Sequence, residues 1–110
     1  MKTSEPKRFV SVLPELAAEL QRMLAERGES KLAEQVQELN LIERCRCGDD
    51  FCATFYVLPK PVGAYGLGHR NVALTPREGI LILDVLADKI AAVEVLYRNE
   101  VREKLLVEFP

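Results

Sequence analysis

Residues 79–97 read GILILDVLADKIAAVEVLY and carry the strongest structural signal in the chain. Two apolar runs rich in β-branched residues, Ile80 to Leu86 and Lys89 to Tyr97, flank a short break at Ala87 and Asp88, which is typical of a β-hairpin. The first four residues of the first run are all apolar. We therefore expect this strand to be covered on both faces or to lie inside its sheet.

Working back from this hairpin, three weaker strand patterns precede it. Two of them, Leu41 to Cys47 and Phe51 to Leu58, flank a Gly-Asp-Asp turn and predict a second tight hairpin. Prolines and glycines then make Pro59 to Arg70 a loop, and Asn71 to Leu74 is a short strand. Together the patterns predict an antiparallel meander of four to five strands.

Helical periodicity dominates the first third of the chain. Apolar residues recur at three- and four-residue steps between Leu13 and Leu24. Ser11 can cap the start of this helix, and Gly28 is a typical end. A second, shorter helix begins at Ser30, so the N-terminal part is a helical hairpin.

The closing segment predicts one more short helix, over residues 99–106, with the charges from Arg98 to Lys104 on its solvated face. The fold class is therefore α+β: an N-terminal helical hairpin packed on an antiparallel β-meander of four to five strands, with a short C-terminal helix. A length of 110 residues predicts a single domain over 1–110, with residues 1–10 as a flexible tail.

The charge composition restricts the classes of partner that the chain can bind. Fifteen Lys and Arg against seventeen Asp and Glu give a net charge of -2, so we expect neither nucleic acid nor an anionic membrane surface as a partner. No run of about 18 apolar residues predicts a membrane span, and no signal-peptide pattern opens the chain. Three cysteines are an odd number, which argues against a complete set of disulfides of the kind found in secreted proteins. We expect a cytoplasmic protein of bacterial type.

The three cysteines lie in one turn segment, RCRCGDDFC, residues 44–52. Cys45 and Cys47 are two residues apart and share a strand face. If Asp49 and Asp50 form the centre of the turn, Cys47 lies opposite Cys52, and Cys45 lies opposite Thr54. The sulfurs then cluster on one face, with the neighbouring Arg44 and Arg46 on the other.

Such a cluster has three interpretations. Cys45, Cys47 and Cys52 with His69, the only histidine, can supply the four ligands of a structural or regulatory zinc site. Alternatively, the thiols support a redox or thiol-based enzymatic role, including a Cys47 to Cys52 disulfide. In the third interpretation the cysteines are buried thiols that act as small apolar residues, and the protein needs no cofactor.

The glycine-rich loop offers a binding surface. Residues 63–70 read GAYGLGHR, but they neither join a strand to a helix nor end as a phosphate-binding loop does. Tyr65, His69 and Arg70 are instead candidates for contacting a protein partner, because loops on a rigid sheet commonly carry binding residues.

Two carboxylates interrupt the apolar strands of the 79–97 hairpin. With a two-residue turn, Asp84 pairs with Ala91 and Glu94 with Leu81, which predicts opposite faces for the two acids. Separate structural roles follow from that register, and no catalytic set is readable.

The segment from Gly79 to Val85, with Ile90 and Val93 to Leu96, resembles small bacterial proteins of unknown function whose C-terminal hairpin reads G-x-hydrophobic-x-L-D-V…I…I/V-E-V-L. The resemblance covers about the last third of the chain. It implies a compact β-rich domain and supplies no catalytic residue. The cysteine segment lies outside it.

The leading hypothesis is a non-enzymatic protein-binding module, of the kind that neutralises toxins as immunity proteins or antitoxins do. The second hypothesis is a zinc-supported hairpin on Cys45, Cys47, Cys52 and His69, and the third is a thiol-based enzyme or redox protein. A free sheet edge also allows a homodimer.

Overall fold

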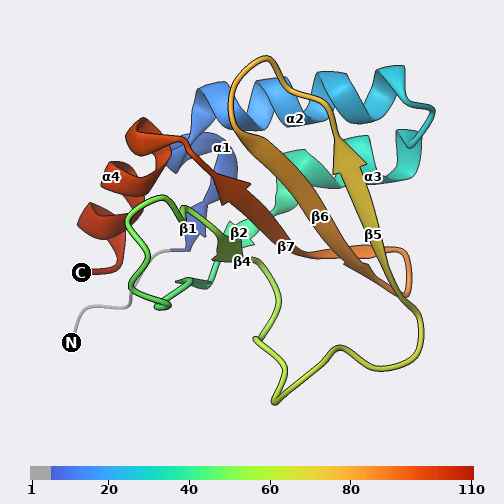
Figure 1. Ribbon diagram of the computed structural model, residues 1–110. Coiled ribbons are helices and arrows are strands. Elements are labelled where there is room, and N and C mark those ends of the chain that lie inside the picture. The colour runs from blue at the N-terminus through green and yellow to red at the C-terminus, as the bar shows by residue number, and fades with distance from the viewer. Residues whose placement is uncertain (1–5) are drawn as a thin grey trace.

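The computed structural model describes residues 6–110, in which a block of helices precedes most of the strands (Figure 1). The helical segments are α1 (Phe9–Val12), α2 (Pro14–Glu26), α3 (Ser30–Gln35), the 3-10 helix η1 (Val36–Glu38) and α4 (Asn99–Glu108). The strands are β1 (Lys7–Arg8), β2 (Asn40–Leu41), β3 (Glu43–Arg44), β4 (Phe55–Tyr56), β5 (His69–Leu74), β6 (Ile80–Leu86) and β7 (Lys89–Leu96). The predicted α+β class is confirmed.

Five strands form one antiparallel sheet in the order β3-β4-β7-β6-β5, and β1 and β2 form a separate pair. The expectation that the Ile80 strand lies inside its sheet is confirmed, because β6 lies between β7 and β5. The loop after β4 carries the chain across to β5 at the far edge (Figure 1).

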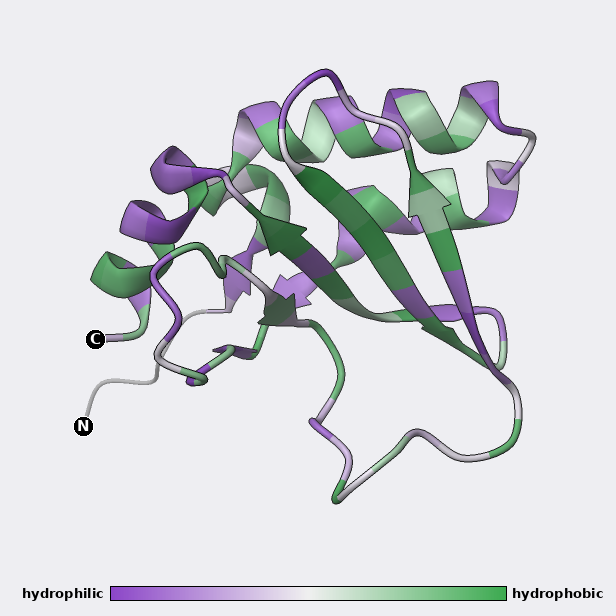
Figure 2. Ribbon diagram, in the orientation of Figure 1, coloured by the Kyte–Doolittle hydropathy of each residue, from purple (hydrophilic) through white to green (hydrophobic). Residues whose placement is uncertain are grey.

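One face of the sheet packs on the helices, which lie behind it in Figure 1. Figure 2 shows β6 and β7 as mostly hydrophobic strands, each interrupted by a hydrophilic band, while hydrophobic and hydrophilic residues alternate along α2. The core combines apolar residues of both layers: Leu16, Leu20, Leu24 and Leu32 from the helices, and Phe55, Leu81, Leu83, Val93 and Val95 from the strands. We call the helix-covered face the inner face and the opposite face the outer face.

The chain is already structured at Lys7, before the end of the predicted tail. Lys7 pairs with Leu41, and Phe9 is fully buried with its ring centroid 5.2 Å from that of Phe55. The predicted flexible tail is therefore wrong from residue 7 onward, since burial of Phe9 fixes this segment to the core. Residues 1–5 lie outside the described residues.

Helix α2 begins and ends by different means. Its N-cap is Leu13, with Pro14 at the first helical position and no side-chain cap, whereas Ser11 lies inside α1. The predicted Ser11 cap is wrong because a turn of helix already occupies that position. The end at Gly28 is confirmed by its φ of +86°, which only glycine adopts without strain.

The cysteine hairpin is shorter than its pattern predicts but keeps the predicted register. Arg44 pairs with Phe55, and the Cys45 amide donates to the Thr54 carbonyl over 2.8 Å. Cys52 forms an isolated bridge to Leu96 of β7, so the returning chain leaves its own hairpin and follows the neighbouring strand.

A β-bulge changes the register of β6 and β7. Leu86 pairs with Lys89 across the two-residue turn and Val85 with Ile90, but Asp84 pairs with Ala92. Ala91 is therefore an extra residue without an opposite partner. Its carbonyl accepts hydrogen bonds from the Val57 and Leu58 amides, which fix the start of the long loop.

None of the helices within residues 6–110 is long and apolar enough to cross a membrane.

Candidate functional site

The bulge at Ala91 brings Asp84 and Glu94 to one face of the sheet. Glu94 lies opposite Ile82 rather than Leu81, and Ile82 and Asp84 share the outer face because they are two residues apart. The prediction of opposite faces is wrong for this reason. One inserted residue moves every side chain after it to the other face.

Asp84 is the centre of a polar cluster, although it is only 5% exposed. Its Oδ1 atom lies 2.8 Å from Nε2 of His69 and accepts a hydrogen bond of 2.7 Å from Nδ2 of Asn71. Both partners come from β5, next to β6 in the sheet. A hydrogen bond to Asp84, burial and the charge of Asp84 raise the pKa of Glu94 to about 7.

Tyr65 brings the glycine-rich loop onto this cluster. Its ring stacks on His69 with centroids 4.6 Å apart and planes at 18°. Its hydroxyl is buried without a hydrogen-bond partner. Burial, followed by the charges of Asp84 and Glu94, raises the pKa of Tyr65. Tyr65 is thus half-buried, with its ring on His69.

The structure separates the three predicted partner-binding residues. Tyr65 and His69 lie together over the acid cluster, but Arg70 points to the inner side of β5 and forms a bidentate ion pair with Glu29. The two Arg70 bonds measure 3.0 and 3.1 Å. Alternation along β5 accounts for the split, because neighbouring residues of a strand face opposite sides.

The cysteines form a second cluster. The Sγ atoms of Cys45, Cys47 and Cys52 all lie within 4.8 Å of one another, which confirms the predicted grouping of the sulfurs. All three are free thiols, with Cys47 exposed and the other two half-buried. A disulfide interpretation is not needed for this arrangement, and three closely spaced thiols suit a metal ion.

His69 does not join the cysteines. Its Nε2 atom faces Asp84, and within the described chain no histidine or carboxylate completes the group of three thiols. Of the predicted four ligands, the three cysteines thus come together and His69 does not. The physical reason is that the returning loop places His69 at the start of β5, on the far edge of the sheet from β3.

The thiols differ in acidity. A hydrogen bond from the Asp49 backbone lowers the pKa of Cys47, but burial and hydrogen bonds to Cys45 and Cys52 outweigh it and raise this pKa to about 11. Burial acts to raise the pKa of Cys52, but the backbone and hydroxyl of Thr54 and the two other thiols hold it below its usual value. Cys52 is therefore more acidic than Cys47.

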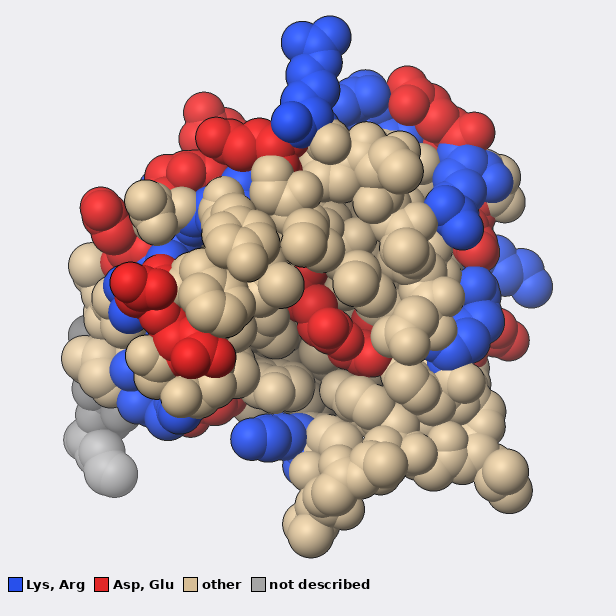
Figure 3. All heavy atoms as spheres, in the orientation of Figure 1, with Lys and Arg blue, Asp and Glu red and all other residues tan. Residues whose placement is uncertain are grey.

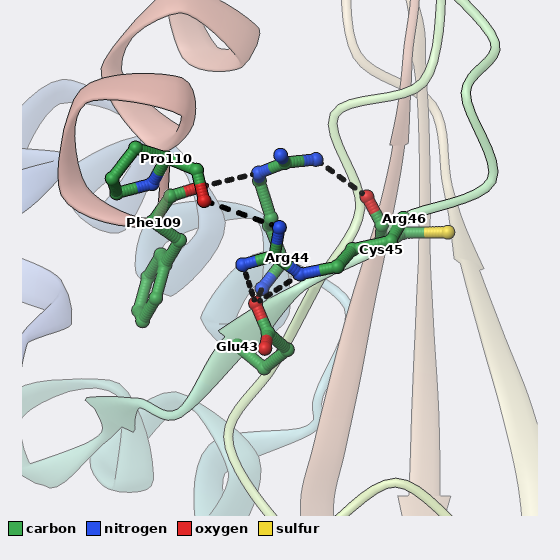
Figure 4. A network of polar contacts seen from close by, with 6 residues as sticks. All are labelled: Glu43, Arg44, Cys45, Arg46, Phe109 and Pro110. Carbon is green, nitrogen blue, oxygen red and sulfur yellow. Dashed lines mark hydrogen bonds and ion pairs between the residues drawn. The ribbon is translucent and has the colours of Figure 1, made fainter.

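Arg44 and Arg46, which flank Cys45, serve the structure rather than the sulfurs. Figure 4 shows Arg44 and Arg46 directed toward the C-terminal residues and the Cys45 sulfur directed away. Arg44 donates to the Phe109 carbonyl, and Arg46 pairs with Glu43 over 3.0 Å and donates to Pro110. The predicted separation of cations and sulfurs is confirmed.

Tyr56 lies between the two clusters. It stands two residues from Thr54, and its pairing with Ala92 places it on the outer face. Burial, then the neighbouring Cys45 and Tyr65, raises the pKa of Tyr56 to about 12. The thiols, two phenols and the acid pair therefore occupy one continuous stretch of the outer face.

The sequence patterns did not predict that Asp84, Glu94, Asn71 and Tyr56 belong to one site. Polar residues inside apolar strands were the available signal for Asp84 and Glu94, but their meeting depends on the bulge. Tyr56 gave no signal, since an aromatic residue is ordinary in a strand.

No family model, curated protein or solved structure matches this chain.

Proposed function

We propose that this chain binds one Zn²⁺ ion through the thiolates of Cys45, Cys47 and Cys52. The observation that carries the proposal is the spacing of the three sulfurs, all within 4.8 Å of one another. Zn–S bonds of about 2.3 Å require tetrahedral sulfurs about 3.8 Å apart, a distance that small side-chain rotations reach from this arrangement.

Charge supports a divalent ion. Three ionised thiols this close repel one another, and the two nearby arginines are committed to the C-terminal residues. A Zn²⁺ ion neutralises most of that charge and deprotonates the thiols as it binds. Thiolates select zinc and other thiophilic ions over Mg²⁺ or Ca²⁺.

The proposed site has three protein ligands and an open fourth position. Because Cys47 is exposed, water or a group from a partner molecule can reach that position. The ion would cross-link the Cys45–Cys52 turn, whose returning arm is held by the bridge of Cys52 to Leu96 and by the backbone hydrogen bonds Tyr97 to Phe51 and Ala53 to Val95.

Metal content tests this proposal. The protein is purified reduced and without metal-affinity chromatography, and zinc is counted by elemental analysis. We expect one zinc per chain, lost in Cys45→Ser, Cys47→Ser and Cys52→Ser. Replacement by Co²⁺ should give a thiolate-to-cobalt charge-transfer band in the native chain and none in these variants.

His69→Ala is the matched control. Retention of zinc by this variant supports three cysteine ligands alone, whereas its loss in a folded protein supports the four-ligand set. Wild type and Cys52→Ser should unfold at the same temperature in excess chelator, and only wild type should gain stability from zinc, by about 3 kcal/mol at a hundredfold excess over Kd. Zinc retained by all three serine variants contradicts the proposal.

A second candidate function is a protein-binding module, supported by the apolar residues that the outer face exposes. Ile80, the first residue of β6, is 39% exposed, and Tyr97, directly after β7, is 58% exposed. Tyr65 and His69 lie on this face and are the predicted partner-binding residues that suit it. Arg70, paired with Glu29, belongs to the other side.

A further inference from the structure

The outer face of the sheet has no helix packed on it within residues 6–110. The helices lie behind the sheet or beside its β3 edge in Figure 1. Ile80 and Ile82 of β6 stand opposite Leu96 and Glu94 of β7 on this face. The outer face therefore presents an apolar surface where an α+β sheet is commonly solvated and polar.

Aromatic rings extend this surface at the end of β7. Phe51 and Tyr97 are 37% and 58% exposed, and their rings stack with centroids 5.3 Å apart. The Tyr97 amide donates to the Phe51 carbonyl, which holds the two residues side by side. Exposed aromatic pairs of this kind are typical anchors for a partner.

The acid pair lies within the apolar surface. Figure 3 shows one group of acidic atoms in the middle of this face, surrounded by uncharged residues. Glu94 has Ile82 directly across the ladder, with Ala92 and Leu96 two residues away along its own strand. In the part of the chain that the structure describes, neither Asp84 nor Glu94 forms an ion pair with a lysine or arginine.

We propose that the outer face docks a protein segment that is apolar except for one lysine or arginine, whose cation is held by Asp84 and Glu94. The proposal deepens the protein-binding candidate and rests on it. Charge complementarity selects this occupant: within residues 6–110 no lysine or arginine pairs with the two acids, and the contacts of His69 and Asn71 engage only Oδ1 of Asp84, inside a surface that otherwise binds apolar groups.

The same charges disfavour a second copy of the chain as the occupant. A symmetric dimer whose two-fold axis passes through the middle of this face brings each acid pair against its own copy. Like charges held together in an interface cost several kcal/mol. A partner that carries a cation at this place has no such cost.

Small amphiphilic probes test the proposal on the full chain. Hexylammonium, hexanol and hexanoate share one alkyl chain and differ in charge, and their binding is followed by amide chemical shifts at pH 8. We expect shifts on β5, β6 and β7 for hexylammonium, with an affinity about tenfold above that of hexanol, and no binding of hexanoate.

Variants locate the cation. Glu94→Gln should remove the advantage of hexylammonium over hexanol, while Glu34→Gln, an exposed carboxyl on α3 behind the sheet, should leave it unchanged. Carbon-detected titration provides a second readout, because a bound cation favours the ionised carboxylate and should lower the pKa of Glu94.

The outcomes separate the proposal from the function on which it rests. Equal affinity of hexylammonium and hexanol for this face contradicts the cation proposal and leaves the apolar binding surface in place. Absence of shifts on β5 to β7 with every probe contradicts both. A dimer in sedimentation experiments that buries this face assigns the surface to a second copy and also overturns the proposal.

Discussion

Ala91 determines which side chains meet on the outer face. If Ala91 took a regular place in the ladder opposite Asp84, Glu94 would pair with Leu81 and point into the helices, where an unpaired carboxylate is costly. With Ala91 bulged out, Glu94 lies on the same face as Asp84, and hydrogen bonding to Asp84 raises the pKa of Glu94. A single residue thus converts two unrelated polar positions into one site.

Glu94 should make stability depend on pH. Its pKa in the folded chain, about 7, is above the ordinary value of 4.5, because hydrogen bonding to Asp84 on β6, burial and the charge of Asp84 outweigh the opposing charge of His69 on β5. Tyr65 of the loop also faces the two acids. Between pH 4.5 and pH 7 the folded state therefore keeps a proton that the unfolded state has lost. Its contribution to the free energy of unfolding falls as pH rises through this window and stays constant above it.

Glu94→Gln should remove this dependence. In urea unfolding, the variant should be more stable than wild type at pH 8, by on the order of 1 kcal/mol after solvent screening, and close to wild type at pH 4. Glu34→Gln is the control at an exposed position. A Glu94→Gln effect of the same size at both pH values would show that the two acids do not share a proton.

At the scale of the element, the β6–β7 turn is the best-defined strained point of the fold. Ala87 and Asp88 have φ values of 51° and 65°, the conformation of a two-residue hairpin turn that favours Asn-Gly. This turn matches the twist of the flanking strands, so strand pairing offsets the backbone strain at Ala87 and Asp88. The Asp88 carbonyl also accepts a hydrogen bond from Gln35 of α3, which a substitution of the side chain leaves intact.

Asp88→Gly should therefore stabilise the protein by a few tenths to about 1 kcal/mol, because glycine adopts positive φ without a steric cost. Asp50→Gly is the matched control: Asp50 lies in the other turn and is not among the residues with positive φ. There the same change should destabilise by about 0.5 kcal/mol through the entropy of the unfolded chain. Thermal and urea unfolding measure both, and a loss of stability in Asp88→Gly would contradict the argument.

At the scale of the whole molecule, Arg98 joins three parts of the chain. It is only 7% exposed and donates to Glu19 of α2 over 3.0 and 2.7 Å and to the Glu78 carbonyl before β6 over 2.7 Å. The predicted solvated position of Arg98 is wrong, since the start of α4 turns it toward α2. Sequence charge patterns cannot reveal such a partner 79 residues away.

Arg98→Ala should cost about 3 kcal/mol, because it leaves Glu19 and the Glu78 carbonyl without their donor. Arg22→Ala removes a solvent-exposed pair with Glu26 on α2 and should cost less than about 0.5 kcal/mol. Urea unfolding of both variants, with Glu19→Gln to complete a double-mutant cycle, measures the coupling. Equal losses of unfolding free energy in Arg98→Ala and Arg22→Ala would show that the Arg98–Glu19 pair does not stabilise the packing of α2 against the start of α4.

The sequence by itself determined the fold class, the inner position of β6, the end of α2 at Gly28 and the grouping of the three sulfurs. These depend on local periodicity and turn chemistry, which act over a few residues. Only the tertiary structure decided that Glu94 lies on the same face as Asp84, that His69 contacts Asp84 and not the cysteines, and that Arg98 is buried and paired with Glu19. A bulge, a loop path and a helix contact each depend on packing between distant segments, and no local pattern of residues records that packing.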